Sequence, residues 1–234
     1  MAKQRPIRYA VVGLGHIAQV AVIPAFAHAR RNSKLVAIVS GDRTKRRELA
    51  RRHRIEHTFT YEEFDECLRV VDAVYIALPN SMHAEYAIRA ARAGVHVLCE
   101  KPMAVTVEEC RQMVAACRKA KVKLMIAYRL HFEGLNLAAI DIARSGQLGV
   151  LKFFNSSFAM TVRRGDIRTK RAFGGGTLYD IGIYCINAAR NLFRAEPTHV
   201  SAVSINSGLA SLSEIDETTA ATLRFGNEIG RAHV

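Results

Sequence analysis

Lys101 stands where an ammonium group could act on a bound ligand. It follows a short apolar run, Val95 to Cys99, which predicts a buried parallel strand. Because Pro102 cannot continue a central ladder, this strand ends at the charged pair Glu100 and Lys101. In an open α/β sheet, ligands bind at the edge formed by the carboxyl ends of the strands. The local sequence would be the same for a lysine that is merely solvated at a strand end. A functional role for Lys101 therefore depends on further residues at that edge.

A glycine-rich turn supplies the second candidate site. Gly13, Gly15 and Ala18 form the pattern G-x-G-x-x-A between an expected strand and a helical pattern. In this context Gly13 permits the turn, Gly15 lets a pyrophosphate approach the backbone, and Ala18 lets helix and strand pack closely. The free N–H groups at the helix start, at His16 and Ile17, favour a phosphate. The pattern predicts dinucleotide binding; the alternative is a purely structural turn.

The choice of cofactor depends on residues at the end of the second expected strand. An NAD site usually carries an acidic residue about 20 positions past the glycines, where it binds the ribose hydroxyls. Here Ser40 and Gly41 occupy that place, and Arg43 and Lys45 follow, which suits the 2′-phosphate of NADP. Asp42 could still reach the ribose, and the two cations could be the first turn of a solvated helix. The residues therefore predict NADP, with NAD as the alternative.

A third polar group follows the triple glycine at 174–176. The residues after it fit a helix that carries Asp180 and Tyr184 at i and i+4, on one face. Two structural explanations compete with a functional one. An acidic residue is favoured at a helix N-terminus by the dipole, and a tyrosine on a helix is often a half-buried aromatic.

The elements that must position these residues alternate regularly in the first half of the chain. Apolar runs at 8–12, 34–39, 72–78, 95–99 and 123–127 are separated by helical patterns, which predicts a doubly wound parallel sheet. The pattern changes after Tyr128. There we expect helices at 136–145 and 177–187, a loop at 162–172, and strands at 149–159, 198–205 and 218–225. The predicted fold is an α/β Rossmann domain, residues 1–127, followed by an α+β domain, residues 128–234, with an open, mostly antiparallel sheet.

Composition excludes several classes of protein. No stretch of the 234 residues approaches the roughly 20 apolar residues of a membrane span, and no apolar signal region precedes the first strand, so a cytoplasmic location is expected. The five cysteines lack metal-binding spacing and are expected to be reduced thiols, and no metal is predicted. The net charge of +13 comes largely from helix-like stretches rich in arginine, without a nucleic-acid-binding motif. A solvated basic face is therefore favoured over a nucleic-acid site.

Five motifs between residues 7 and about 225 occur together. They are Gly13-x-Gly15-x-x-Ala18, Leu78-Pro79-Asn80-Ser81-x-His83, Glu100-Lys101-Pro102-Met103, Tyr128-Arg129-x-His131 and Gly174-Gly175-Gly176-Thr177-Leu178-Tyr179-Asp180-Ile181-Gly182-Ile183-Tyr184. Together they resemble the Gfo/Idh/MocA family of oxidoreductases, and the Ser40–Gly41 turn with Lys45 is most similar to its glucose-fructose oxidoreductase branch. The resemblance implies hydride transfer between NADP and a sugar such as glucose or xylose.

The resemblance also implies which residues form the site. Lys101, Asp180 and Tyr184 match the catalytic positions. Tyr184 would take the proton of the sugar hydroxyl, Lys101 would favour its phenolate and stabilise the alkoxide, and Asp180 would orient sugar hydroxyls or fix Lys101. Arg129 and His131 could contact substrate or be structural. The implied cofactor-binding residues are Gly13, Gly15, His16, Ile17, Ala18, Ser40, Gly41, Arg43, Lys45, Leu78, Pro79, Asn80, His83, Glu100, Lys101 and Arg129.

Two other functions stay open at this point. One is an NAD-dependent inositol or dihydrodiol dehydrogenase of the same fold, and the other is a non-catalytic nucleotide-sensing relative. The last residues, 229–234, are not expected to continue a strand and resemble a translated sequencing adapter, so the second domain is expected to be truncated. This polypeptide is then expected to be poorly soluble or inactive, whereas the full-length protein would be a homodimer or homotetramer.

Overall fold

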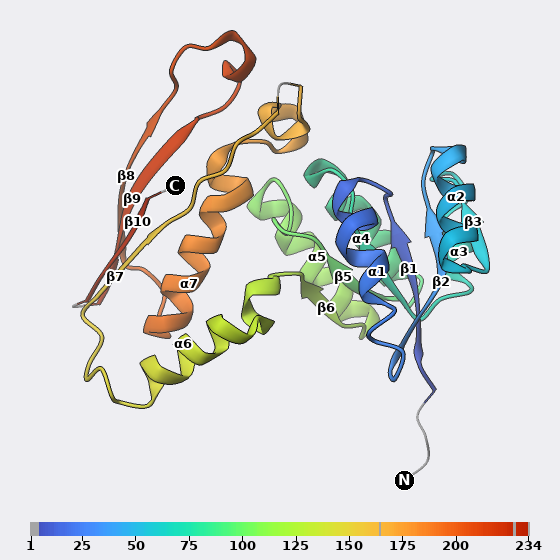
Figure 1. Cartoon of the computed structure of the whole chain (residues 1–234), viewed down its shortest axis with the longest axis horizontal. Helices are drawn as coiled ribbons and strands as arrows, with labels where there is room; N and C mark the ends of the chain where they lie inside the picture. The colour runs from blue at the N-terminus through green and yellow to red at the C-terminus, as the bar shows by residue number, and fades with distance from the viewer. Residues whose placement is uncertain (1–4, 164, 227, 234) are drawn as a thin grey trace. The chain divides into compact units, whose positions relative to one another are not determined.

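The computed structural model describes residues 5–163, 165–226 and 228–233, the last six by their backbone alone. The chain divides into two compact units, Met1–Ala127 and Tyr128–Val234 (Figure 1). None of the helices in the described part of the chain is long and apolar enough to cross a membrane.

The first unit is built on a six-stranded sheet in which every neighbouring pair of strands is parallel. Its strands are β1 (Ile7–Val12), β2 (Ser33–Val39), β3 (His57–Phe59), β4 (Ala73–Ile76), β5 (His96–Cys99) and β6 (Leu124–Ile126). Their order, β3-β2-β1-β4-β5-β6, is that of a doubly wound dinucleotide-binding sheet. The predicted Rossmann fold is confirmed: the apolar strands are buried on both faces, and the helices that join them make the crossover connections that parallel pairing requires.

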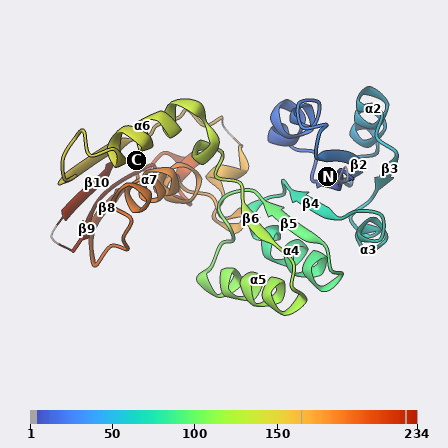
Figure 2. The same cartoon turned by 90° about the horizontal axis from the view of Figure 1, so that it is seen from below.

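Helices cover the two faces of this sheet. They are α1 (Ile23–Ala25), α2 (Arg43–His53), α3 (Phe64–Leu68), α4 (His83–Arg92) and α5 (Val107–Ala120), together with a π-helical turn at Ala18–Val22 and a 3-10 turn at Asn80–Met82. Ala10, Val12 and Val74 point to the face packed by α3, α4 and α5, and α4 and α5 lie side by side (Figure 2). Val11 and Ile38 point to the other face, packed by α1 and α2. The alternation follows from the two-residue period of a strand.

Capping residues set where two of the helices begin. The Thr106 hydroxyl oxygen accepts a hydrogen bond from the backbone N–H of Glu109, and the Glu109 carboxylate accepts one from the Thr106 N–H, which forms a capping box. Asp42 caps α2 by accepting from the backbone N–H of Lys45 at 3.0 Å. Asp42, which the sequence offers as a possible ribose-binding residue, therefore also has a structural role as the cap of α2.

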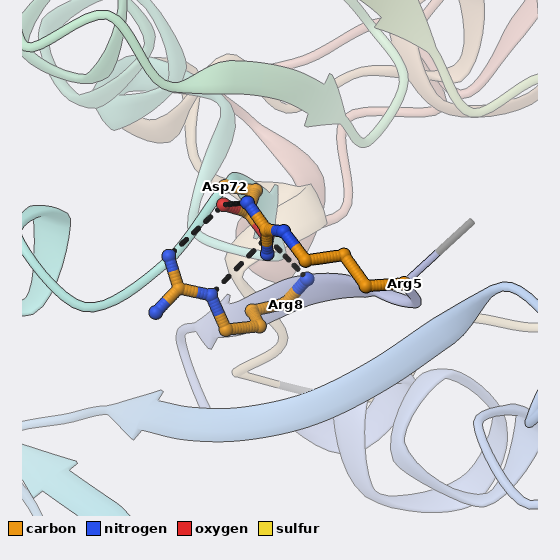
Figure 3. A network of polar contacts seen from close by, with 3 residues as sticks. All are labelled: Arg5, Arg8 and Asp72. Atoms are coloured by element: carbon orange, nitrogen blue, oxygen red, sulfur yellow. Dashed lines mark hydrogen bonds and ion pairs between the residues drawn. The ribbon is translucent and has the colours of Figure 1, made fainter. Parts of the chain in front are cut away.

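Asp72 ties the strands together at the opposite edge of the sheet, where β1 and β4 begin (Figure 3). Its carboxylate accepts hydrogen bonds from the guanidinium groups of Arg5 and Arg8 and from the Arg8 backbone N–H at 2.8 Å. The side-chain hydrogen bond from Arg8 is the largest of the causes that hold the Asp72 pKa well below its ordinary value. This charged cluster lies at the amino ends of the strands and stabilises the start of the fold rather than the ligand edge.

The second unit packs one long helix on a mixed four-stranded sheet. Its strands follow the order β7 (Phe153–Ser157), β10 (Glu228–His233), β9 (Thr218–Phe225) and β8 (His199–Ile205), and only the β7–β10 pair is parallel. Its helices are α6 (Gly134–Arg144) and α7 (Ile183–Phe193), with 3-10 turns at Arg129–Phe132, Ile167–Thr169, Arg171–Phe173 and Ala210–Leu212. Leu223 and Phe225 of β9 and Ala189 of α7 form its small core.

One expectation about this unit is wrong. Residues 229–233 do form a strand, β10, which pairs with both β7 and β9. The apolar alternation expected of a strand is missing there, but backbone pairing to two neighbours requires only an extended chain between two open edges. The strand expected at 149–159 is also shorter, Phe153–Ser157, and the loop expected at 162–172 contains two 3-10 turns.

Candidate functional site

The glycine turn is held against the end of β4. Gly13 has φ +94°, and a Cβ placed on it would lie 2.5 Å from the backbone oxygen of Ala77. Its N–H donates to the Val39 oxygen of β2 at 2.9 Å. A Cβ on Gly15 would meet no atom within 4 Å, so the space beside Gly15 is open. Gly13 thus closes the turn and Gly15 leaves room for a ligand, which fits the division of roles predicted for the two glycines.

The helix that follows the turn starts with the predicted phosphate-facing residues exposed. His16 and Ile17 are exposed, whereas Ala18 is fully buried against the sheet. The first regular turn, Ala18–Val22, is π-helical. Local π turns occur frequently at functional sites because they displace side chains from the regular helical rows. Gly15, His16 and Ile17 are all exposed residues, as an anion site at a helix start requires.

Polar groups gather at the end of β2. Ser40 is almost buried and its hydroxyl accepts from the Asp42 N–H at 3.2 Å. The ammonium of Lys45 lies 3.3 Å from the Asp42 carboxylate. Arg46, which the sequence reasoning left out of the site, donates from Nη1 to the Ser40 oxygen at 2.6 Å. The signal that could have identified it is its position one helical turn after the Asp42 cap.

Gly41 and Arg43 complete this corner, and both are exposed. A Cβ on Gly41 would lie 3.6 Å from the ring of Tyr61, an ordinary contact, so the ring does not itself require glycine there. The corner therefore offers three cationic side chains, Arg43, Lys45 and Arg46, around one exposed backbone turn.

His83 connects two loops of the same edge. Its ring is fully buried, with Nδ1 2.8 Å from the Pro102 oxygen and Nε2 3.0 Å from the Leu78 oxygen. Burial lowers the pKa of His83, while the two carbonyl contacts oppose that shift. Predicted as a cofactor-binding residue, His83 sits beneath the surface, where it can act on a ligand only through the loops that it joins. Pro79 and Asn80 lie half-buried in the first of these loops.

Glu100 and Lys101 form the other loop. The Glu100 N–H donates to the Ile76 oxygen of β4 at 2.9 Å, which keeps the two strand ends together. The Tyr75 hydroxyl donates to Glu100 Oε1 at 2.6 Å, and the Lys101 N–H donates to Glu100 Oε2 at 3.2 Å. Lys101 is half-buried, and its peptide bond to Pro102 is cis. The sequence did not identify Tyr75 as a residue of this site, because an aromatic side chain is common in a strand.

The second unit has a cavity of its own. It measures about 500 Å³ and lies between the end of β7, the start of β9 and the helix that carries Asp180. Asp180 and Thr177 line it, and the Thr177 hydroxyl lies 2.8 Å and 2.9 Å from the backbone oxygens of Asp216 and Glu217. Phe158 also lines the cavity, and its ring centroid is 5.6 Å from that of Tyr184. The structure therefore brings Asp180 and Tyr184 to one neighbourhood.

The helix geometry differs from the regular turn expected there. Residues Leu178–Gly182 form a π-helical turn, and the α-helix begins only at Ile183. Tyr184 packs edge-on against Tyr128, with centroids 6.1 Å apart. The expected i, i+4 pair of Asp180 and Tyr184 thus spans the junction of a π turn and an α-helix.

Arg168 is the main residue of this cavity that sequence reasoning missed. Its Nε donates to Asp180 Oδ2 at 2.7 Å, and its Nη1 donates to Asp166 Oδ1 at 3.2 Å. Burial alone would disfavour the charged guanidinium, but the carboxylates of Asp180 and Asp166 outweigh it and raise the Arg168 pKa above its ordinary value. The sequence places Arg168 in a basic loop without periodicity, so only the folded chain reveals its partner.

Arg129 and His131 belong to the turn that opens the second unit. Arg129 is exposed. His131 Nε2 lies 2.5 Å from Asn187 Oδ1 of α7, which favours the structural role considered for it. Among the residues that the structure describes, no group of three or more histidine, cysteine or acidic side chains is arranged to hold a metal ion.

Comparison with known proteins identifies the family. Residues 7–128 match the GFO/IDH/MocA oxidoreductase family with its NAD-binding Rossmann fold, and residues 137–233 match the GFO/IDH/MocA C-terminal domain. The chain belongs to the Gfo/Idh/MocA family. The resemblance seen in the sequence is confirmed. Three of its five motifs lie at the sheet edge, the motif at 174–184 contributes to the cavity, and Tyr128–His131 lies in the turn that opens the second unit.

Three similar proteins show how the chain relates to other Gfo/Idh/MocA members. An uncharacterized oxidoreductase of Rhizobium meliloti is 38% identical over 94% of this chain and 65% of its own length. An NADP-dependent D-xylose 1-dehydrogenase of Haloarcula marismortui is 33% identical over 91% of this chain and 60% of its own. The structure of an aldose-aldose oxidoreductase from Caulobacter crescentus has 39% identity and a TM-score of 0.92, over 98% of this chain and 70% of that one. The chain thus spans less than two thirds of the length of these two curated relatives.

Proposed function

We propose that this Gfo/Idh/MocA protein is an NADP-dependent oxidoreductase that transfers a hydride between nicotinamide and a hydroxyl-bearing carbon of an aldose such as xylose or glucose. The observation that carries the proposal is the Asp180 cavity of the second unit, combined with a first unit whose open Gly15 turn and Lys101 share one sheet edge. The similar D-xylose dehydrogenase and aldose-aldose oxidoreductase support the sugar as substrate.

The residues of the first unit fit the proposed dinucleotide. The exposed residues 15–17 would bind the pyrophosphate through their backbone N–H groups, because the first N–H groups of a helix have no partner within the helix. Arg43, Lys45 and Arg46 surround the turn after β2, where an NADP 2′-phosphate would lie. Asp42 is already engaged as the α2 cap and as the partner of Lys45. This engagement favours NADP over NAD, since the one acidic side chain at the turn is partly neutralised.

The proposed mechanism assigns a separate role to each catalytic residue. Bound NADP supplies the hydride-accepting carbon. Tyr184 takes the proton from the sugar hydroxyl, and the ammonium of Lys101 stabilises the negative charge that develops on that oxygen. Asp180 hydrogen-bonds neighbouring sugar hydroxyls and fixes the ring in the cavity.

Turnover by a lysine variant tests the assignment. Lys101→Met should lower kcat for aldose oxidation by about a hundredfold or more, because one charge-stabilising donor is lost. NADPH binding, measured by its fluorescence, should change much less. Lys123→Met is the matched control, since Lys123 is an exposed lysine at the amino end of the adjacent strand β6. Unchanged aldose turnover in Lys101→Met would exclude a catalytic Lys101.

The competing functions make different predictions. An NAD-dependent inositol or dihydrodiol dehydrogenase would bind NADH more tightly than NADPH and would not turn over aldoses. A nucleotide-sensing protein would bind the cofactor without any turnover. A fluorescence titration with both reduced cofactors, followed by assays with aldoses, inositols and dihydrodiols, separates the three.

We also propose that the full-length protein assembles into a homodimer or homotetramer through the second sheet, and that it does not bind nucleic acid. On the sheet face opposite α7, Phe153, Val203 and Ile205 are each more than half exposed. Exposed apolar side chains on one face of a sheet are found at protein–protein interfaces. Light scattering after size-exclusion chromatography measures the assembly, and a gel-shift assay tests nucleic-acid binding. The cytoplasmic location stays a prediction.

A further inference from the structure

We propose that Arg168 is the positioning residue of the substrate cavity, which orients the Asp180 carboxylate for the sugar. This inference rests on the proposed function, and it adds a residue to which neither the motifs nor the relatives assign a role. It depends on contacts made entirely within the second unit.

The guanidinium of Arg168 joins two carboxylates on different elements. Nε donates to Asp180 on the π-helical turn at 2.7 Å, and Nη1 donates to both oxygens of Asp166 at 3.2 Å and 3.3 Å. A planar guanidinium presents its donors in a fixed geometry, so holding one carboxylate restricts where the other can lie. The Asp180 side chain is only 15% exposed, so its position is determined by the protein rather than by solvent.

The backbone of Arg168 is fixed independently of its side chain. Its carbonyl oxygen accepts a hydrogen bond from the Gly176 N–H at 3.0 Å. A Cβ on Gly175 would lie 2.3 Å from that same oxygen and 2.8 Å from the oxygen of Lys170. The second glycine of the triple glycine therefore lets residues 168–170 pack directly against the start of the helix that carries Asp180. Both ends of the arginine are thus held in relation to that helix.

Arg168 and Asp180 lie where a substrate would bind. Arg168, Asp180 and Thr177 line the same cavity of about 500 Å³, together with apolar side chains such as Phe158 and Ile215. Because Arg168 is neutralised by two carboxylates, the cavity offers paired hydrogen-bonding groups rather than a net positive charge. Such a lining fits an uncharged polyhydroxylated ring, whose hydroxyls both donate and accept, better than a phosphorylated one.

Kinetics of Arg168→Met test the inference. We expect kcat with an aldose to fall by about a hundredfold, since misplacing a substrate-orienting group by about 1 Å costs on that order. Arg168→Lys should recover only part of the loss, because one ammonium cannot bridge both carboxylates. NADPH affinity should be unchanged, since the proposed cofactor residues lie in the other unit. A merely structural arginine would lower the unfolding temperature without lowering kcat of the folded enzyme.

Lys170→Met provides the matched control. Lys170 lies on the same loop and makes a comparable ion pair, with Glu214 at 2.7 Å, but it neither contacts Asp180 nor lines the cavity. Its loss should leave kcat unchanged. If Arg168→Met fails to fold, Asp166→Asn decides instead, because it removes one of the two carboxylates that hold the guanidinium and should lower kcat about tenfold.

Two results would overturn the inference in distinguishable ways. Parental kcat in folded Arg168→Met, or in Asp166→Asn when the first variant does not fold, removes Arg168 from the site and leaves the proposed function standing. Absence of turnover by the full-length parent protein with every aldose tested removes the proposed function and the role of Arg168 with it.

Discussion

Replacing Gly13 by alanine perturbs one of the closest contacts in the first unit. The residue has φ +94°, a conformation that costs an L-residue about 1–3 kcal/mol. In addition, the new Cβ would lie 2.5 Å from the Ala77 oxygen and 2.9 Å from the Ala77 carbonyl carbon. These are backbone atoms of a buried strand end that cannot rotate away, and overpacking of this kind costs about 1–3 kcal/mol. The free energy of unfolding should therefore fall by about 2–6 kcal/mol.

Thermal unfolding followed by circular dichroism measures this loss. In a protein of this size each kcal/mol lowers the unfolding temperature by about 2–4 °C, so Gly13→Ala should unfold at least about 4 °C below the parent. Gly15→Ala is the matched control, because its Cβ would meet no atom within 4 Å. We expect its unfolding temperature to stay within about 2 °C of the parent.

NADPH titration of the control variant separates stability from ligand binding. In Gly15→Ala a methyl group would stand where the pyrophosphate is proposed to approach, so affinity should fall at least about tenfold although the fold is intact. If Gly13→Ala unfolds at the parental temperature, the close approach to Ala77 does not exist in solution. If instead Gly15→Ala binds NADPH as tightly as the parent, the space beside Gly15 is not the phosphate site.

Three further substitutions test other parts of the argument. Asp72→Asn should destabilise the protein at pH 7 by about 1 kcal/mol, because charge-assisted hydrogen bonds at a partly exposed site are lost. Since the folded state lowers the Asp72 pKa, this stabilisation is complete above about pH 4 and is lost at lower pH, so urea unfolding curves of variant and parent should converge on acidification. Asp42→Asn keeps a residue able to cap α2 and releases Lys45, so NADPH should bind several-fold more tightly relative to NADH in a fluorescence titration, with no loss of stability. His83→Leu should lower the free energy of unfolding by about 1–3 kcal/mol, because the single N–H of a neutral imidazole is lost and a buried carbonyl oxygen loses its donor, whereas exposed His16→Leu should change it little. Equal stabilities of the two histidine variants in calorimetry would contradict the bridging role of His83.

The amino-acid sequence was sufficient for the parts of this protein that depend on neighbours along the chain. The alternation of apolar runs with helical patterns predicted the doubly wound sheet, because a buried parallel strand and an amphipathic helix each have a local period. The capping box at Thr106 and Glu109 also depends on a local pattern, since its two hydrogen bonds join residues three apart. The glycine turn, too, is a local pattern between a strand and a helix, and the family motifs could be recognised without coordinates.

Only the tertiary structure determined the contacts between residues that are far apart along the chain. Gly13 must be a glycine because of Ala77, a residue 64 positions away, and no local pattern contains that distance. His83 looked like a ligand-binding residue but proved to be a buried bridge between two loops, since burial depends on the whole fold. In the sequence, nothing distinguishes Arg168 from the basic residues beside it. The structure distinguishes it, because its loop packs against the helix that carries Asp180. Long-range pairing selects one partner among many of the same type, and that selection is made by packing rather than by residue type.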